Sequence, residues 1–333
     1  MVGSYPMSLE TKEERVKLTP TLAEIGEKRV IEAITSVAPS SINGDDAAVL
    51  HTPVPNRRTV ATTDLLVEGR HFRLDWSTPE EVGHKAIVQN FADIEAMGAR
   101  PAAALLGLAA PADTPISIVQ GIARGIAEAS SHYNTELVGG DVTQAGELVV
   151  SITAIGALGG DRQALTLDRA RPGQQVVAHG KIGWSAAGLA LLERFGRALP
   201  EEHSELWPLI DAHCAPWITP GRGQVARATG VTAMTDNSDG LIPDLSTIAA
   251  RSGVSIDLFA DAIKPDPLLV QAGALLGRDP LEWVHAGGED HTLLATTAKP
   301  APSGFRVIGE VVRGESVTVD GRPSPYTKGW ASF

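Results

Sequence analysis

Apolar residues recur at helical spacing, three and four positions apart, in several segments of the chain. The ends of these segments carry typical helix signals. Thr21 with Glu24, and Thr78 with Glu81, have the spacing of a capping box, and Pro79 occupies a first helical position. The expected helices are residues 21–38, 79–97, a segment opening at Pro115, about 185–195, and 240–253.

Shorter apolar runs bounded by glycine or polar residues predict strands. In the first half these are "RTVATTD", "AAALLGLAA", "ELVGGD" and "LVVSITAIGAL", and "NGDDAAVL" reads as a turn feeding a short strand. In the second half they are "QQVVAHG", "VTAMTD", "VSIDLF", "HTLLATT" and "RVIGEVV". Strands and helices alternate in both halves, so the fold class is α/β or α+β. Residues 200–222 show no regular pattern and are expected to be irregular.

The domain organisation follows from length and one polar stretch. A chain of 333 residues exceeds what one hydrophobic core usually serves. Residues 159–174, which include Pro172 and Gly173, are interpreted as a junction. We therefore expect a disordered leader over 1–18, an N-terminal domain over 19–160 and a C-terminal domain over 161–333.

Composition narrows the class of protein. The net charge of -12 argues against non-specific nucleic-acid binding, which relies on basic surface. A single cysteine, Cys214, excludes an intramolecular disulfide and a multi-cysteine metal site. No apolar run approaches about 18 residues, and the N-terminus lacks the apolar core of a signal peptide. A cytoplasmic protein that binds no membrane is the simplest interpretation.

Carboxylates recur where a strand meets glycine or a hydroxyl residue. One such residue is more often an ordinary turn or cap, but the pattern repeats across both halves. Oxygen ligands without cysteine suit Mg²⁺, which binds through a few carboxylates together with substrate phosphates. The series is Asp45 and Asp46 in "NGDDAA", Asp64 in "TTD", Asp141 in "GGD", Asp236 and Asp239 in "TDNSDG", Glu289 and Asp290 in "GGED", and Asp93 on the helix after "TTD".

The sequence gives little support to other metal sites or to other catalytic motifs. The chain has no EF-hand run, no "HExxH" zinc motif and no Walker A loop. "GWSAAG" is not the G-x-S-x-G elbow of a hydrolase. If ATP binds, it binds without the common phosphate loops.

The ordered set of motifs "GDDAAV", "TTDLLVEGRHF", "DIEAMGARP", "LVGGD", "SDGLIPDL", "GGED" and "KGW" resembles the thiamine-monophosphate kinase family. The resemblance covers roughly residues 20 to 333 and extends to the superfamily of aminoimidazole-ribonucleotide synthetase and selenophosphate synthetase. It implies a two-domain fold whose N-terminal domain, which binds metal and ATP, forms a shared barrel in a homodimer. A C-terminal α+β domain packs against it.

The resemblance implies direct transfer of the γ-phosphate of ATP to thiamine monophosphate, with several Mg²⁺ ions. The phosphate acceptor is mostly dianionic at neutral pH and needs no general base. Metal positions match Asp46, Thr62, Thr63, Asp64, Asp93, Asp141, Asp236 and Asp239, of which Asp64, Asp93 and Asp141 are expected to be catalytic. Nucleotide positions match Gly140, Asp141 and Ser238, and substrate positions match His71, Glu289 and Trp330.

The chain departs from the family at one position and leaves two alternatives. Where the family often has an arginine that reaches the ATP phosphates, this chain has Leu167, and Arg169 is the candidate replacement. Another ATP-using enzyme of the superfamily, such as aminoimidazole-ribonucleotide synthetase, is one alternative. A non-catalytic homologue that binds nucleotide or metal is the other. A selenophosphate synthetase is disfavoured because the only cysteine lies in mid-chain.

Overall fold

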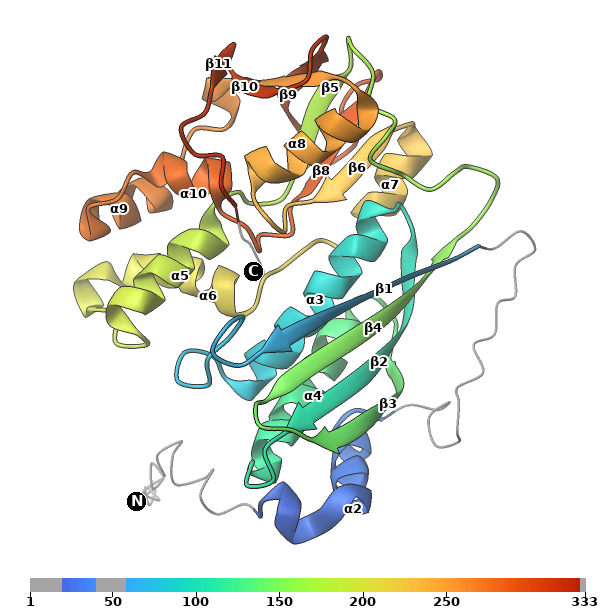
Figure 1. Cartoon of the computed structure of the whole chain (residues 1–333), viewed down its shortest axis with the longest axis vertical. Coiled ribbons are helices and arrows are strands. Elements are labelled where there is room, and N and C mark those ends of the chain that lie inside the picture. Colours follow the sequence, from blue (N-terminus) through green and yellow to red (C-terminus); the bar gives the residue numbers. More distant parts are fainter. Residues whose placement is uncertain (1–19, 40–57, 330–333) are drawn as a thin grey trace, which may run out of the picture.

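The computed structural model describes residues 20–39 and 58–329, which form two sheets on either side of segment 159–174 (Figure 1). The predicted leader 1–18 and the "GDDAAV" motif lie outside the described residues. The first sheet contains β1 (Arg58–Val67), β2 (Arg100–Ala110), β3 (Leu137–Gln144) and β4 (Val149–Leu158). The second contains β5 (Gln175–His179), β6 (Ala233–Asp236), β7 (Ser255–Leu258), β8 (Leu293–Thr297), β9 (Arg306–Val312), β10 (Val317–Val319) and β11 (Arg322–Pro323). The mixed α/β class is confirmed.

The first sheet has the order β1-β4-β2-β3, with β1 and β3 outermost. β4 runs antiparallel to both of its neighbours, and β2 and β3 are parallel. Leu65 aligns with Ser151, Ser151 with Gly107, and Gly107 with Asp141, so these four residues form one row across the sheet. Because side chains alternate along a strand, this register decides which face each residue occupies.

Helices cover one face of this sheet: α3 (Pro79–Ala96) and α4 (Ile116–Ser131), with α2 (Leu22–Val37) beyond them (Figure 1). Phe91, Ile87 and Ile122 are fully buried in the core between helices and sheet. The predicted capping box of α3 is confirmed. Glu81 N donates to Thr78 Oγ1 over 3.1 Å, and Thr78 N donates to the Glu81 carboxylate over 2.6 Å. The other face of the sheet is called the outer face below.

The second half contains α5 (Trp184–Phe195), α6 (Trp207–Cys214), α7 (Arg222–Thr229), α8 (Leu241–Ser252), α9 (Pro267–Leu276) and α10 (Pro280–Ala286). Its sheet has the order β11-β10-β7-β9-β5-β8-β6. The prediction that 200–222 is irregular was wrong, because a 3₁₀ helix over Glu201–Leu206 and α6 occupy much of it. No described helix is long and apolar enough to cross a membrane.

Helix α3 contacts both halves of the molecule. It packs on β1 and β4 of the first sheet and also on β6 and α7 of the second half. Near its C-terminal end, the Glu95 carboxylate accepts hydrogen bonds from Gly221 N and Gly223 N, each over 2.6 Å. The helix therefore fixes where side chains from the two halves meet.

A pair of glycines sets the distance between α3 and α4. A Cβ added at Gly83 would lie 2.0 Å from Ile122 O, and one added at Gly125 would lie 1.9 Å from Glu80 O. Since each obstacle is a backbone atom, neither contact can be relieved by a side-chain rotation. The two helices pack closely because neither position carries a side chain.

We predict that Gly83→Ala destabilises the protein by about 1–3 kcal/mol or more, since the added methyl group must push α4 away from α3. Thermal unfolding measures this change. Gly146→Ala is the matched control, because nothing lies within 4 Å of a Cβ at that position. Equal melting temperatures for the two variants would contradict the packing argument.

Candidate active site

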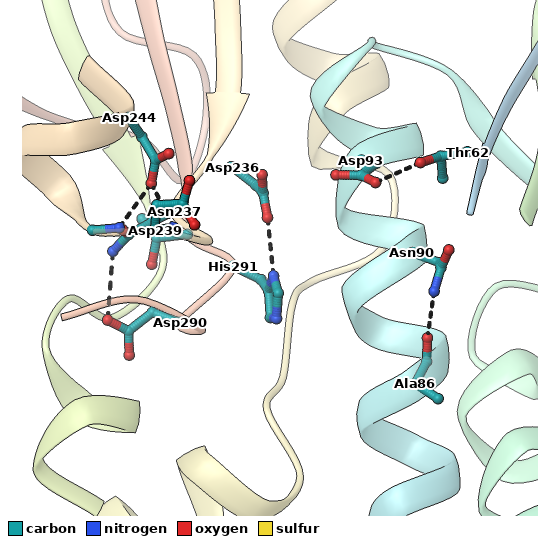
Figure 2. Close-up of polar contacts among 12 residues, drawn as sticks. Thr62, Ala86, Asn90, Asp93, Asp236, Asn237, Asp239, Asp244, Asp290 and His291 are labelled. Carbon is teal, nitrogen blue, oxygen red and sulfur yellow. Dashed lines mark hydrogen bonds and ion pairs between the residues drawn. The ribbon is translucent and has the colours of Figure 1, made fainter. Parts of the chain in front are cut away.

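The end of β1 and the face of α3 supply one side of the site. Thr62 and Asp64 occupy the helix-covered side of β1, where they align with the buried residues Ala154 and Ile152 of β4. Thr62 Oγ1 donates to Asp93 Oδ2 of α3 over 2.7 Å (Figure 2). This contact joins two of the predicted metal positions.

The second half supplies the facing side. β6 ends at Asp236, and the following turn carries Ser238 and Asp239. His291 Nδ1 hydrogen-bonds to Asp236 Oδ2 over 2.9 Å. Figure 2 shows Asp93 and Asp236 facing one another from α3 and β6, so the two halves present carboxylates to a common space.

A cavity of about 420 Å³ occupies this space. Its walls come from both halves, and predicted site residues make up most of them. It is called the carboxylate cavity below. The lining residues are Asp64, Leu65, His71, Gln89, Asp93, Asp236, Ser238, Asp239, Glu289 and His291.

Burial and mutual repulsion perturb these acids. Burial, assisted by the nearby Asp236 and Asp64 carboxylates, raises the pKa of Asp93 to about 7. Burial is also the main cause that raises the pKa of Asp64, against the effect of a hydrogen bond with Gln89. The pKa of Asp239 is raised by burial and by Asp236. Carboxylates gathered in this way favour a bound cation.

The donor chemistry fits magnesium. Within the described residues, neither lysine nor arginine forms an ion pair with Asp64, Asp93 or Asp239. In the same part of the chain, no three carboxylate, histidine or cysteine side chains converge on one point as a ready-made metal site. Mg²⁺ commonly takes one or two carboxylates and completes its shell with phosphate and water, so spaced oxygen donors suit it.

The structure separates other predicted metal and nucleotide residues from this cavity. Thr63 projects to the outer face and donates to Ile152 O over 3.1 Å. Asp141 is exposed in the outer-face row at the opposite edge of the sheet, and its neighbour Gly140 lies beside it on β3. Arg169 is exposed in segment 159–174 and does not line the cavity.

The predicted substrate residues stand at the rim of the site. His71 Nδ1 accepts a hydrogen bond from Val67 N over 3.1 Å, which holds the turn after β1. Glu289 lines the carboxylate cavity and also a neighbouring cavity of about 480 Å³ that includes Trp283 and Gly329. The latter is called the second cavity below. Trp330, like Asp46, lies outside the described residues.

Three residues of this region were missed from the sequence: Gln89, His291 and Lys85. Lys85, Gln89 and Asp93 stand four positions apart and so share one face of α3. A polar stripe on an otherwise buried helix was the available signal. His291 gave no comparable signal, because its role depends on the tertiary contact with Asp236.

Two α/β halves around a carboxylate-lined cavity define a protein of the AIR synthase-related class. In agreement, residues 44–158 match the family model "AIR synthase related protein, N-terminal domain". The chain belongs to the thiamine-monophosphate kinase family. It is 60% identical to the thiamine-monophosphate kinase of Corynebacterium glutamicum, across 94% of this chain and 95% of that protein.

Further relatives agree with this assignment. The thiamine-monophosphate kinase of Mycobacterium tuberculosis is 43% identical, with 95% of this chain and 94% of that protein covered. A solved structure described as AaThiL complexed with AMPPCP and TMP superposes with a TM-score of 0.76 at 33% identity. That match covers 95% of this chain and all of the other.

Asp93 provides a pH-dependent prediction. Its pKa is about 7 in the folded chain against an ordinary 3.8, so the folded state binds the proton more tightly. The free energy of unfolding of the metal-free protein therefore falls as pH rises from about 4 to about 7, because the unfolded chain loses this proton at a lower pH than the folded chain does. Asp93→Asn should therefore raise the melting temperature of metal-free protein slightly at pH 5, where only part of this loss has developed. At pH 8 the increase should be larger by about 2–6 °C, as expected for a further roughly 1–2 kcal/mol.

Thermal unfolding at both pH values, with and without Mg²⁺, tests this prediction. Mg²⁺ should stabilise wild type more than Asp93→Asn at pH 8. Asp261→Asn, which changes an exposed carboxylate outside the cavity, serves as the control. The same shift at pH 5 and pH 8 would show that Asp93 is not the titrating group.

Proposed function

We propose that this chain transfers the γ-phosphate of ATP to thiamine monophosphate and releases thiamine diphosphate and ADP. The observation that carries the proposal is the carboxylate cavity, whose acids come from both halves, in a member of the thiamine-monophosphate kinase family. The relative described with AMPPCP and TMP supports the same pair of ligands, since AMPPCP is an analogue of ATP.

Magnesium would be held by Asp64, Asp93, Asp236 and Asp239, with the Thr62 hydroxyl beside Asp93. When bound, it supplies positive charge that allows two polyanions to approach and stabilises charge in the transition state. The acceptor oxygen already carries negative charge at neutral pH, so no side chain need remove a proton. The protein's contribution is to align donor and acceptor and to exclude water.

The acceptor side extends from Glu289 into the second cavity. Thiamine carries a permanent positive charge on its thiazolium ring, which a carboxylate attracts. Trp283 is buried and lines this cavity, so its ring contributes aromatic surface to the acceptor side. Trp330 follows directly after the lining residue Gly329 and is proposed to stack on the substrate ring.

The nucleotide side includes Ser238, which lines the carboxylate cavity. Gly140 and Asp141 cannot reach that cavity within one chain. β3 and β1 are separated by two strands, or roughly 14 Å, and Asp141 projects to the other face. Arg169 remains a candidate for the ATP phosphates that would act from segment 159–174.

Pairing of two chains would bring Asp141 to a site. No helix of the described chain covers the outer face, which carries Ala61, Leu105 and Ile155 (Figure 1). Leu65 at its edge is 53% exposed, and together with these neighbours it gives the outer face an apolar surface. We propose that a second copy covers this face in a homodimer and that Asp141 completes the site of the partner.

The first test is ADP release that depends on thiamine monophosphate. Wild type should release ADP only when ATP, Mg²⁺ and thiamine monophosphate are all present, and Asp64→Asn should lose at least about 100-fold in kcat. Asp261→Asn should behave as wild type. Absence of thiamine-dependent release would favour a different superfamily reaction or a non-catalytic homologue. Near-normal turnover by Asp64→Asn would remove Asp64 from the metal set.

Subunit complementation tests the shared site. Asp64→Asn and Asp141→Asn homodimers should each be inactive. If Asp141 acts in the partner's site, a mixed dimer retains one intact site, and random mixing restores about a quarter of wild-type activity. The two variants are unfolded and refolded together, and each variant refolded alone is the control. One variant carries an affinity tag, so that co-purification of the untagged variant demonstrates mixed dimers. No recovery in a preparation that contains mixed dimers would place both residues in one chain's site or remove Asp141 from it.

A further inference from the structure

Lys85 is the most deeply buried cation of the site region. Its side chain is 2% exposed, although lysine is almost never fully buried without a specific partner. It lies on α3, one turn before Gln89 and two turns before Asp93. It lines neither the carboxylate cavity nor the second cavity, so it does not stand where it would touch a ligand directly.

The Lys85 ammonium joins two segments at the rim of the site. Nζ donates to His71 O over 3.1 Å and forms an ion pair with Glu289 Oε1 over 2.9 Å. His71 belongs to the turn after β1, and Glu289 belongs to the segment before β8, so one side chain connects the two halves of the molecule. The His71 carbonyl anchors the ammonium, and the ammonium in turn holds the carboxylate.

The backbone around Glu289 is already fixed. Glu289 and His291 both have left-handed backbone angles, φ 61° and 52°, which are strained for residues other than glycine. Glu289 N donates to Ser238 O over 2.9 Å, and a Cβ at Gly288 would lie 2.2 Å from the same oxygen. The Glu289 side chain therefore leaves a rigid turn, and its own contacts decide where its carboxylate points.

Only one of those contacts is charged. Oε2 of Glu289 lies 3.5 Å from His213 Nδ1, but burial lowers the pKa of His213 to about 3, so its ring is neutral. Lys85 is thus the only lysine or arginine that forms an ion pair with Glu289 among the described residues. Buried ion pairs often add little stability compared with apolar residues of the same volume, so stability alone is a weak reason for this pair.

We propose that Lys85 is a positioning residue that acts through Glu289: it holds the Glu289 carboxylate, between the two cavities, in the orientation that receives the cationic ring of the acceptor. This inference rests on the proposed function. It predicts that Lys85 affects binding of the cationic acceptor and leaves binding of the nucleotide nearly unchanged.

Steady-state kinetics on four variants test it: Lys85→Met, Glu289→Gln, the double variant, and Arg197→Met. Arg197 is the matched control, because its guanidinium also connects the two halves, through Glu81 and Trp76 O, at a place away from both cavities. Lys85→Met should raise the KM for thiamine monophosphate by about 10- to 100-fold, as expected for breaking a buried charge pair. The KM for ATP should change less than about 2-fold, and Arg197→Met should change neither KM.

Comparing the double variant with Glu289→Gln distinguishes a positioning role of Lys85 from a role in packing. If Lys85 acts through Glu289, the double variant and Glu289→Gln share the same KM for thiamine monophosphate, because Lys85 has no carboxylate left to hold. Should Lys85→Met fail to fold, this comparison still decides, since the double variant leaves no unpaired buried charge. A further rise of that KM in the double variant, or equal rises for both ligands in Lys85→Met, would overturn the inference.

Wild-type turnover is measured first and distinguishes the two proposals. Wild type that makes thiamine diphosphate, with Lys85→Met behaving as Arg197→Met, overturns the role of Lys85 and leaves the proposed function intact. Wild type that makes no thiamine diphosphate overturns the proposed function and this inference with it.

Discussion

Repulsion among carboxylates in a half-buried cleft is the constraint on which the rest of this structure depends. Asp64, Asp93 and Asp236 face a common cavity, and burial raises the pKa values of the first two. The Thr62 hydroxyl donates to Asp93 and Gln89 hydrogen-bonds to Asp64; both partners are neutral, so the negative charge of these two acids remains available to a cation. The surrounding fold must hold the acids in place against their repulsion, and it does so through a helix that packs on both halves.

That helix was also the element most readily predicted from the sequence. The capping box and Pro79 are local signals, and the structure reproduces both. Helix α7 was not predicted. The N–H groups at its start, of Gly221 and Gly223, donate to Glu95 of α3, and no local sequence pattern predicts such a contact. α9 was overlooked although Asp266 caps it, because its apolar residues are spread around the helix and give no clear period.

The candidate active site also combines features that the sequence predicted with features that it could not predict. Carboxylates at strand ends were predicted from the chain, and those on β1, α3 and β6 meet at one cavity. Strand order and register could not be predicted, and they place Asp141 on the other face of the sheet. The ion pair between Lys85 and Glu289 could not be predicted from the sequence either, because the two residues lie far apart in the chain and come into contact only when the halves pack together.

Sharing one helix between the halves limits how the molecule can move. Opening the cleft about a hinge would separate Glu95 from Gly221 and Gly223, and Lys85 from Glu289, and would expose buried charge. Small sliding movements of packed elements cost less. The cavity walls should therefore be nearly the same before and after ligands bind. A competitive inhibitor designed against the ligand-free protein would then meet the surface that the substrates meet.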